Sequence, residues 1–365
     1  MSTDKFSSED IKFLKLTLKL AKKGTGFTAP NPMVGAVIVK NGKIIGQGYH
    51  KKYGGPHAEI EALNSTKKSV VGATMYVNLE PHGFQGVNTP PCTEAIIKAG
   101  IKKVVCCTLD PNHKVAGNGI KQLIAAGIKT EFGALTKEAE ELNSAFFTFH
   151  QKQRPLVAIK FACSLDGKIA TKIHESKWIT NEAARQYARI LRGEYQSILV
   201  GINTVLADDP HLGARNKNQK DPIRVIIDPN LKIPLQSQVL RDNNVLILTS
   251  TLSNKNKKKQ LQKSGFKIVE FKNKFISVKQ ILTALHAQRI ISVFIEGGSQ
   301  TLGNFVDSKL VDKVYTFHAP IIIGGTESLS AIGGQGITKL KEALHIKEPQ
   351  LKKFGDNFLI FGNVE

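Results

Sequence analysis

Two short stretches of the sequence carry an imidazole, a carboxylate and a thiol at spacings that could hold a metal ion. His57 and Glu59 lie two residues apart, directly before the apolar positions of a predicted helix. Cys92 follows two prolines and opens a second predicted helix, which ends before Gly100. A catalytic zinc site needs two or three nitrogen or sulfur ligands, an open position for water, and a nearby carboxylate that moves protons without ligating the metal. These residues therefore predict metal-assisted hydrolysis.

The order of these residues narrows the chemistry. A His-x-Glu pair followed downstream by Pro-Cys contains the elements of the zinc-dependent nucleobase deaminases. A His-x-Glu pair alone is more often an ordinary surface pair, and only its combination with Pro90-Pro91-Cys92 makes the pattern specific. His57 and Cys92 both fall at predicted helix starts, where the positive end of the helix dipole favours a thiolate and a hydroxide on zinc.

The composition predicts two domains in a reducing compartment. A chain of 365 residues with 41% hydrophobic content can bury more than one core. Residues 1–23 predict an amphipathic helix capped by Ser7 or Ser8, and its alternating lysines are typical of neither a signal peptide nor a membrane span. Without disulfide-framework spacing among the cysteines, we expect a cytoplasmic protein with no membrane partner. The cysteines are Cys92, Cys106, Cys107 and Cys163.

The formal charge of +21 raises nucleic-acid binding as an alternative from another class. The lysines are dispersed, the chain has a single Trp, and interleaved stacking aromatics are absent. A basic enzyme for phosphorylated small molecules explains the sign of the charge equally well. RNA binding that persists at moderate salt would favour the nucleic-acid alternative.

Residues 1–150 form the predicted first domain, in which strands and helices are expected to alternate. These elements must position the candidate ligands. This order predicts an α/β fold with a parallel or mixed sheet between helical layers. The expected helices after the first one cover residues 57–63, 92–99, 120–126 and 137–149, and the expected strands cover 34–39, 43–48, 74–78 and 104–108.

Residues 151–365 form the predicted second domain, which begins at a polar linker over 151–155 and is again α/β. A strand–Gly–Gly–helix step at Gly297 and Gly298 can present backbone N–H groups to a phosphate, although the pair alone is a weak signal. The expected strands cover residues 156–163, 197–201, 223–228, 245–249, 292–295, 313–320 and 358–361, with one more after a turn at 164–169, and the expected helices cover 181–193, 202–207 and a segment ending at 307.

The first half carries a series of short motifs: Asn31-Pro32-Met33-Val34-Gly35, Gly46-x-Gly48-x-His50, Gly54-x-Pro56-His57-Ala58-Glu59, Leu79-Glu80-Pro81, Thr89-Pro90-Pro91-Cys92 and Asp110-Pro111-Asn112. Together they resemble the deaminase half of bifunctional riboflavin-biosynthesis proteins. The resemblance implies a cytidine-deaminase-like three-layer domain, with His57 and Cys92 as zinc ligands and Glu59 as the proton shuttle. The tRNA adenosine and cytidine deaminases end instead in Pro-Cys-x-x-Cys, which this chain lacks.

One position departs from the family pattern. The residue after Leu-Glu-Pro is a cysteine and the third zinc ligand in that family, whereas here it is His82. The loop from His82 to Cys92 is also one residue longer than usual, and residues 83–88 lack its usual polar start. Two interpretations stay open. Either His82 ligates zinc through its longer side chain, or the first domain is a decayed scaffold and the protein is a reductase only.

Other residues near these motifs have ordinary structural explanations beside functional ones. His50 either lines the pocket or caps a turn, and Asn31 either sets a turn or hydrogen-bonds a base or sugar edge. Cys106 and Cys107 lie on a predicted strand among valines and are expected in the core. The loop at Gly117 and Gly119 is too generic to predict phosphate binding.

The second half carries its own motifs: Ser164-Leu165-Asp166-Gly167-Lys168, Glu175-Ser176-Lys177-Trp178-Ile179-Thr180, Leu199-Val200-Gly201, Thr204-Val205-Leu206-Ala207-Asp208-Asp209-Pro210 and Ile295-Glu296-Gly297-Gly298. They are similar to the reductase half of the same family, which implies a dihydrofolate-reductase-like α/β domain that uses NADPH. Taken singly, Trp178 could be a core residue and Asp208-Asp209-Pro210 a helix stop.

The resemblance also implies residue roles in the second half. Arg192 and Arg215 suit the phosphate of the substrate, and Lys168 would contact its ribose. The residues implied to touch NADPH are Ala162, Trp178, Thr204, Asp208, Gly297 and Gly298. Those implied to hold the substrate are Lys168, Ser176, Arg192, Leu212, Arg215 and Glu296.

The sequence thus predicts a two-domain enzyme of flavin synthesis that needs Zn²⁺ and NADPH. The first domain is expected to deaminate 2,5-diamino-6-(5-phosphoribosylamino)pyrimidin-4(3H)-one by hydrolysis. The second is expected to reduce the ribosyl chain of that phosphorylated pyrimidine to a ribityl chain. Relatives of this kind are oligomers, so the resemblance implies a homo-oligomer.

Overall fold

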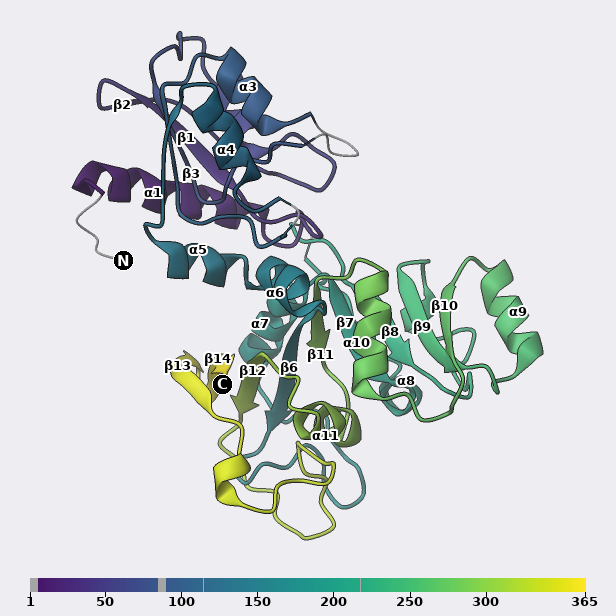
Figure 1. Ribbon diagram of the computed structural model, residues 1–365. Coiled ribbons are helices and arrows are strands. Elements are labelled where there is room, and N and C mark those ends of the chain that lie inside the picture. Colours follow the sequence, from purple (N-terminus) through teal and green to yellow (C-terminus); the bar gives the residue numbers. More distant parts are fainter. Residues whose placement is uncertain (1–5, 85–89, 114, 217) are drawn as a thin grey trace. The chain divides into compact units, whose positions relative to one another are not determined.

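A computed structural model describes residues 6–84, 90–113, 115–216 and 218–365 (Figure 1). The chain divides into two compact units, Met1–Gln153 and Arg154–Glu365, and each is described by itself. Both contain a β-sheet with helices, so the predicted α/β class is confirmed. Residues 1–5 of the predicted first helix lie outside the described residues.

The first unit is built on a five-stranded mixed sheet with the order β2-β1-β3-β4-β5. The first three strands of this order pair antiparallel, and β3, β4 and β5 run parallel. The last strand, which is short and lies at the sheet edge, was not predicted from the sequence. The strands are β1 (Gly35–Lys40), β2 (Lys43–Tyr49), β3 (Thr74–Val77), β4 (Lys103–Cys106) and β5 (Lys129–Phe132).

Helices cover both faces of this sheet, as the predicted three-layer arrangement requires. One core joins α2, α3 and α4 to the sheet, and the other joins α1 and α5 to its opposite face. The helices are α1 (Ser8–Ala21), α2 (Ala58–Asn64), α3 (Cys92–Lys98), α4 (Asn118–Ala125), α5 (Thr136–Leu142) and α6 (Ser144–Lys152), with a 3₁₀ turn η2 (Lys22–Gly24).

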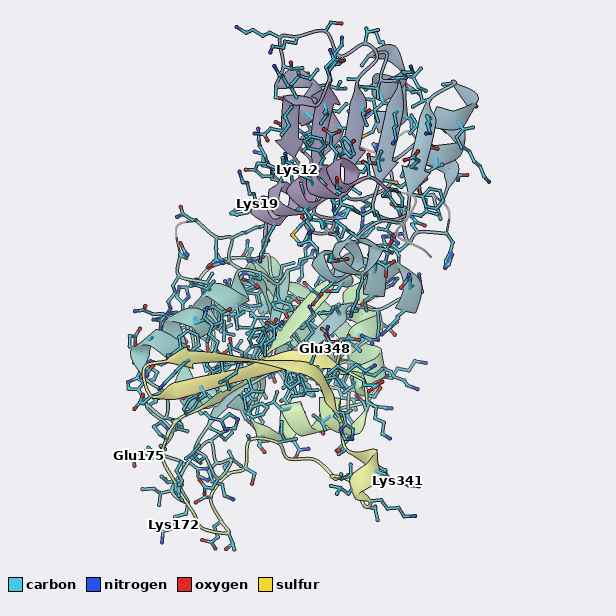
Figure 2. The ribbon with its side chains drawn as sticks, turned by 90° about the vertical axis from the view of Figure 1, so that its left-hand side faces the viewer. Lys12, Lys19, Lys172, Glu175, Lys341 and Glu348 are labelled. Atoms are coloured by element: carbon cyan, nitrogen blue, oxygen red, sulfur yellow. The ribbon has the colours of Figure 1, made fainter. Side chains whose placement is uncertain are left out.

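The first helix begins where the sequence indicates. Ser7 accepts a hydrogen bond from the backbone N–H of Asp10, and the Asp10 carboxylate accepts one from the N–H of Ser7, which forms a capping box. Lys12 and Lys19 stay exposed on α1 (Figure 2). Phe13 and other apolar residues are buried against the sheet, so the helix is amphipathic as predicted.

The single helix predicted over residues 137–149 is wrong. Two helices, α5 and α6, meet at Asn143, whose backbone leaves helical geometry with φ −103° and ψ 23°. Its side-chain oxygen accepts the N–H of Met33 at 2.8 Å, and its amide nitrogen donates to the Met33 carbonyl at 3.0 Å. The break therefore lets Asn143 hydrogen-bond the chain that leads into β1.

The second unit contains a nine-stranded sheet with the order β10-β9-β8-β7-β11-β6-β12-β14-β13. The strands from β10 to β12 in this order run parallel, and β14 and β13 are antiparallel. The strands are β6 (Leu156–Cys163), β7 (Ser197–Gly201), β8 (Ile223–Ile227), β9 (Val245–Ser250), β10 (Lys267–Phe271), β11 (Ser292–Ile295), β12 (Lys313–His318), β13 (Ile346–Phe354) and β14 (Asn357–Val364).

The central parallel strands of this unit are apolar because helices cover them. Side chains of α10 and α11 form one core with Val157, Leu199 and Val293 of three neighbouring strands. Four elements of this unit were not predicted from the sequence: β10, β13, α9 and α10. The helices are α7 (Glu182–Arg192), α8 (Ile202–Asp208), α9 (Lys255–Lys263), α10 (Val278–Ala287) and α11 (Ser299–Asp307), with 3₁₀ turns η3 (Gln238–Leu240) and η4 (Leu340–Glu342).

The strand predicted after the turn at 164–169 is also wrong. Lys168 forms only an isolated bridge with Ser330, and an irregular loop follows, on which Lys172 and Glu175 lie (Figure 2). Asp166 holds this turn, because its carboxylate accepts bonds from the Ser164 hydroxyl and from the backbone N–H groups of residues 323 and 324. These hydrogen bonds lower the pKa of Asp166 to about 2.

In the part of the chain that the structure describes, no helix combines the length and the hydropathy needed to cross a lipid bilayer.

Candidate functional site

His57, His82 and Cys92 lie together in the first unit. Their candidate ligand atoms are all within 4.8 Å of one another, and the His57 Nδ1 and Cys92 Sγ atoms are 3.4 Å apart. Two ligands of a tetrahedral zinc ion, one nitrogen and one sulfur, lie about 3.6 Å apart. The Nδ1–Sγ pair is already at this spacing, and the third ligand would need only a small adjustment.

The backbone fixes these three residues at neighbouring element ends. His57 is the N-cap of α2, and Cys92 is the first residue of α3. The His82 carbonyl accepts the N–H of Cys92 at 3.0 Å and that of Thr93 at 3.3 Å, which holds the two ends of the intervening loop together. Residues 85–89 of this loop, predicted to be longer than usual, lie outside the described residues.

The chemistry of this set fits a zinc ion. Both ring nitrogens of His82 are buried and have no hydrogen-bond partner among the described residues, a costly state that a ligand would relieve. Burial lowers the pKa of His82, and burial together with the neighbouring His82 and His50 rings lowers the pKa of His57 to about 4. Both imidazoles are therefore neutral at pH 7, the form that binds metal.

Glu59 lies on the first turn of α2, beside this cluster. Its side chain is buried and contacts the Cys92 thiol, and its Oε2 atom has no hydrogen-bond partner among the described residues. Burial raises the pKa of Glu59 to about 7. A carboxyl group that titrates near neutral pH can both take up and release a proton, as general acid–base catalysis requires.

His50 and Asn31 form a hydrogen-bonded pair near the cluster. Nδ1 of the buried His50 lies 2.9 Å from the Pro56 carbonyl oxygen, which can only accept, so this nitrogen carries the proton. The other ring nitrogen, Nε2, then accepts the Asn31 amide N–H at 3.3 Å. This leaves the Asn31 side-chain oxygen as an acceptor for a substrate N–H group.

Glu80 organises the loop after β4, a role that the sequence analysis missed. The buried carboxylate accepts backbone N–H groups of Asp110, Gly117, Gly119 and Ile120 at 2.9–3.3 Å. An added Cβ at Gly119 would lie 1.9 Å from the Pro81 carbonyl oxygen, so only glycine fits there. The glycine loop therefore binds a carboxylate of the protein itself.

Replacing Glu80 by glutamine is expected to destabilise the first unit by about 2–4 kcal/mol, because the amide turns a donor toward backbone N–H groups and leaves some of them unpaired. Hydrogen–deuterium exchange at residues 115–120 should accelerate. Glu94→Gln on the exposed side of α3 is the matched control and should change neither stability nor exchange. Unaltered protection in Glu80→Gln would contradict the role.

In the second unit, Arg192 and Glu296 form a largely buried ion pair, whose side chains are 16% and 9% exposed. The Arg192 Nε and Nη2 atoms donate to the two carboxylate oxygens at 2.6 and 3.0 Å, and Lys160 Nζ lies 3.3 Å from Oε2. Burial alone would raise the pKa of Glu296, but the two cations outweigh it and lower this pKa to about 2. Lys160 was missed, although a lysine inside an otherwise apolar predicted strand is a signal.

The other residues implied to hold substrate lie in two connections, one between β6 and α7 and one between α8 and β8. Arg215 is exposed at the surface. Partial desolvation of its guanidinium and repulsion by the positive charges of Arg192, Arg189 and Arg241 lower the pKa of Arg215. Lys168 donates to the Ser328 carbonyl at 3.2 Å. Among the remaining two, Ser176 is exposed on the loop before α7, and Leu212 is buried.

The residues implied to touch NADPH fall into two groups. Thr204 and Gly298 line one cavity of about 700 Å³, whereas Ala162, Trp178, Asp208 and Gly297 do not line it. Trp178 is 70% exposed, so the interpretation as a core residue is wrong. Lys177 Nζ lies 3.5 Å from an Asp208 carboxylate oxygen, which brings the Trp178 loop next to α8.

Features of this cavity fit a dinucleotide. The helix α11 starts after Gly298 without a side-chain cap, so its first N–H groups can donate to a phosphate. An added Cβ at Gly298 would meet nothing closer than the Thr204 hydroxyl at 3.7 Å, and one at Gly297 would clash with Thr301 at 2.6 Å. Gly298 therefore leaves free space beside the backbone, and Gly297 allows the backbone to approach Thr301 closely.

Two family models match the chain, one in each half. The model described as "Cytidine and deoxycytidylate deaminase zinc-binding region" matches residues 7–108. The model described as "RibD C-terminal domain" matches residues 155–360.

Similar proteins match nearly the whole chain. The riboflavin biosynthesis protein RibD of Aquifex aeolicus is 44% identical over 353 residues, which cover 96% of this chain and 98% of that protein. The RibD protein of Escherichia coli is 34% identical over 360 residues, which cover 95% and 97%.

Solved structures agree with the sequence matches. RibD of Acinetobacter baumannii has a TM-score of 0.90 at 34% identity, covering 98% of this chain and 99% of its own. A diaminohydroxyphosphoribosylaminopyrimidine deaminase/5-amino-6-(5-phosphoribosylamino)uracil reductase of Thermotoga maritima has a TM-score of 0.86 at 36% identity and the same coverage.

Proposed function

Because the chain belongs to the RibD family of riboflavin biosynthesis proteins, we propose how it divides a deaminase and a reductase activity between its two units. The unit Met1–Gln153 hydrolytically removes the 2-amino group of 2,5-diamino-6-(5-phosphoribosylamino)pyrimidin-4(3H)-one. The unit Arg154–Glu365 then reduces the ribosyl chain of the product to a ribityl chain with NADPH. The observation that carries the deaminase assignment is the cluster of His57, His82 and Cys92 beside Glu59.

In the deaminase unit, His57, His82 and Cys92 would hold zinc, which supplies a Lewis acid that makes water nucleophilic at neutral pH. Glu59 takes one proton from the attacking water and delivers it to the ring nitrogen. It then passes the second proton, from the hydroxyl now on the ring carbon, to the amino group, which leaves as ammonia. Its buried position keeps the carboxyl protonatable near pH 7. The Asn31 side-chain oxygen, oriented by His50, accepts a substrate N–H group.

His82 is proposed as the third ligand, where the family resemblance implies cysteine. A site with two neutral imidazoles and one thiolate carries one negative charge less than a site with two thiolates. The ion therefore keeps more of its positive charge for water and substrate. The unpartnered ring nitrogens of His82 support this assignment.

Metal analysis of variants at this position tests the assignment. His82→Ala should lose bound zinc, whereas His82→Cys should keep it, because a thiolate replaces the imidazole. With cobalt(II) in place of zinc, His82→Cys should strengthen the near-ultraviolet thiolate-to-metal absorption, since a second sulfur joins the ligands. His113→Ala, a change outside the cluster, is the control. Full zinc content in His82→Ala would contradict ligation by His82.

The deamination rate of His82→Cys, compared with that of the natural protein, gives a second test of this position. Deamination by His82→Cys should exceed that of the natural protein if histidine handicaps the reaction. An unchanged or lower rate, with zinc retained, would instead mean that this chain is adapted to the imidazole. Removal of zinc by a chelator should stop ammonia release and leave NADPH oxidation with the already deaminated pyrimidine intact.

In the reductase unit, NADPH supplies the hydride, and the protein positions it against the first carbon of the ribosyl chain. Arg215 is proposed as the main ligand of the substrate phosphate. Among the described residues it forms no salt bridge, and the nearby Arg189, Arg192 and Arg241 make its surroundings positive. Arg192 and Glu296, which form an ion pair with each other, line the proposed substrate site beside Arg215. Ala162 and Trp178 contact the nicotinamide, with Asp208, Thr204 and the two glycines along the rest of the cofactor.

Ammonia release and NADPH oxidation, measured on the same purified protein with the diaminopyrimidine substrate, test the proposal as a whole. Both activities are expected, with reduction depending on prior deamination. NADPH oxidation without ammonia release would favour the reductase-only alternative, which the similarities do not support. They give no support to nucleic-acid binding either. The homo-oligomer and the cytoplasmic location stay predictions.

A further inference from the structure

The cavity of about 700 Å³ in the second unit extends well beyond the residues implied to touch NADPH. It begins at Thr204 and Gly298, at the starts of α8 and α11. From there it reaches Ile227 at the end of β8, the loop residues 274–277 between β10 and α10, and the first two residues of α10, Val278 and Lys279. Neither the motifs nor the family resemblance gave this loop a role.

The far end of the cavity is positively charged. Lys274 and Lys279 both line it, both are exposed, and neither has a known ion-pair partner among the described residues. The acid in the lining is Asp307, whose two carboxylate oxygens already accept the N–H groups of Gln335 at 2.7 Å and Gly336 at 3.2 Å. Among the described residues neither lysine forms a salt bridge with Asp307 or another carboxylate, and a phosphate dianion suits this end.

An exposed aromatic ring lies between the two lysines in the sequence. Phe275 lines the same cavity and is 74% exposed, an unfavourable position for a phenyl ring without a partner. The turn that carries these residues is fixed, because Ser277 accepts the N–H of Gln280 and caps α10. A planar base stacked on Phe275 would place the sugar attached to it near the lysines.

The strand order places this end at the adenosine half of the cofactor. Ala162, which is proposed to contact the nicotinamide, lies on β6, and Glu296, which is proposed to lie at the substrate, directly follows β11. From β6 to β8 the order is β6-β11-β7-β8, three steps of about 4.8 Å each, or roughly 14 Å. An extended dinucleotide with its nicotinamide at β6 therefore brings its adenosine to β8 and α10.

We propose that Lys274 and Lys279 bind the 2′-phosphate of the adenosine half of NADPH, with the adenine against Phe275, and so make the second unit select NADPH over NADH. This inference rests on the proposed reductase function and adds the origin of cofactor selectivity. The 2′-phosphate is the group that distinguishes the two cofactors, so selectivity must come from residues that contact it.

Binding of NADPH and of NADH to the full chain, each measured by titration calorimetry, tests the proposal. The double variant Lys274→Gln/Lys279→Gln should weaken NADPH binding about 10- to 100-fold, because two charge-assisted contacts to the phosphate are lost, and should change NADH binding less than about 2-fold. Phe275→Ala should weaken both cofactors by a similar factor. Lys272→Gln, an exposed neighbour that does not line the cavity, is the matched control and should change neither.

The outcomes separate this inference from the proposed function. If the natural protein binds NADPH and NADH equally, or the double variant still prefers NADPH, the lysine assignment is wrong while the reductase function stands. If the double variant loses both cofactors to the same extent, the lysines act on the shared part of the molecule and the selectivity claim fails. If the natural protein binds neither cofactor, the reductase proposal falls together with it.

Discussion

Replacing Glu59 by glutamine is expected to lower the rate of ammonia release roughly 10²- to 10⁴-fold, the usual contribution of a positioned general acid–base. Glutamine keeps the size of the side chain and its place on α2 but cannot take a proton from water. Zinc content should stay unchanged, because Glu59 is not among the clustered ligands. The measurements are ammonia release under substrate saturation and metal analysis of the same sample.

Two controls make this result specific. Glu61→Gln alters a carboxylate on the same helix that pairs with Lys51 at 2.6 Å at the surface, and it should leave ammonia release nearly unchanged. NADPH oxidation with the already deaminated pyrimidine should be the same in both variants, since Glu59 belongs to the other unit. Ammonia release at the natural rate in Glu59→Gln would show that another group moves the proton.

Replacing Glu296 by glutamine is expected to destabilise the second unit by about 2–4 kcal/mol, because it leaves Arg192 and Lys160, whose side chains are each only 16% exposed, without a compensating anion. The carboxylate is buried between the two and accepts three contacts within 3.3 Å. Urea unfolding of the second unit, followed by hydrogen exchange in α7 and β11, measures the loss.

The pH dependence of this effect has a definite sign. The pKa of Glu296 is lowered to about 2 from its ordinary value of 4.5. The stabilisation is therefore complete above about pH 4.5 and is lost as the pH falls toward 2. The difference in stability between the natural protein and Glu296→Gln should shrink over the same range.

Glu182→Gln is the matched control for the buried pair. Glu182 also pairs with two cations, Arg185 and Arg189, but its side chain is 53% exposed. The unfolding midpoint should change little, because solvent already screens these charges. Equal destabilisation in the two variants would mean that burial does not set the strength of the Glu296 pair.

The sequence alone was sufficient to predict helix starts, because these depend on residues close together in the chain. The capping box at Ser7 starts α1 as predicted, and Pro91-Cys92 starts α3 as predicted. His57 and Cys92 lie close together because each is at the start of a helix, α2 or α3, and both helices pack in one core on the same face of the sheet. The single helix over 137–149 was wrong because Asn143 is a tolerable helix residue locally, and only its bonds to Met33 give the break a reason.

The roles of long-range partners could not be predicted from one sequence. Glu296 pairs with Arg192 across 104 positions, and Glu80 binds backbone groups about 30 to 40 positions away. The segment that carries Lys274 and Lys279 was missed because it leads into α10, a helix that was itself not predicted. Such contacts depend on strand order, which the alternation of strands and helices does not specify.

The amide of Asn143 also determines where the chain can be divided. Together with Asn78, which donates to the same Met33 carbonyl at 3.0 Å, it pairs the segment that leads into β1 much as a neighbouring strand would. A fragment of the first unit that stops before residue 143 would leave the Met33 N–H unpaired two residues from Asn31. Separate expression of the deaminase unit should therefore retain all of α6, and fragments cut at the end of α5 should fold less stably.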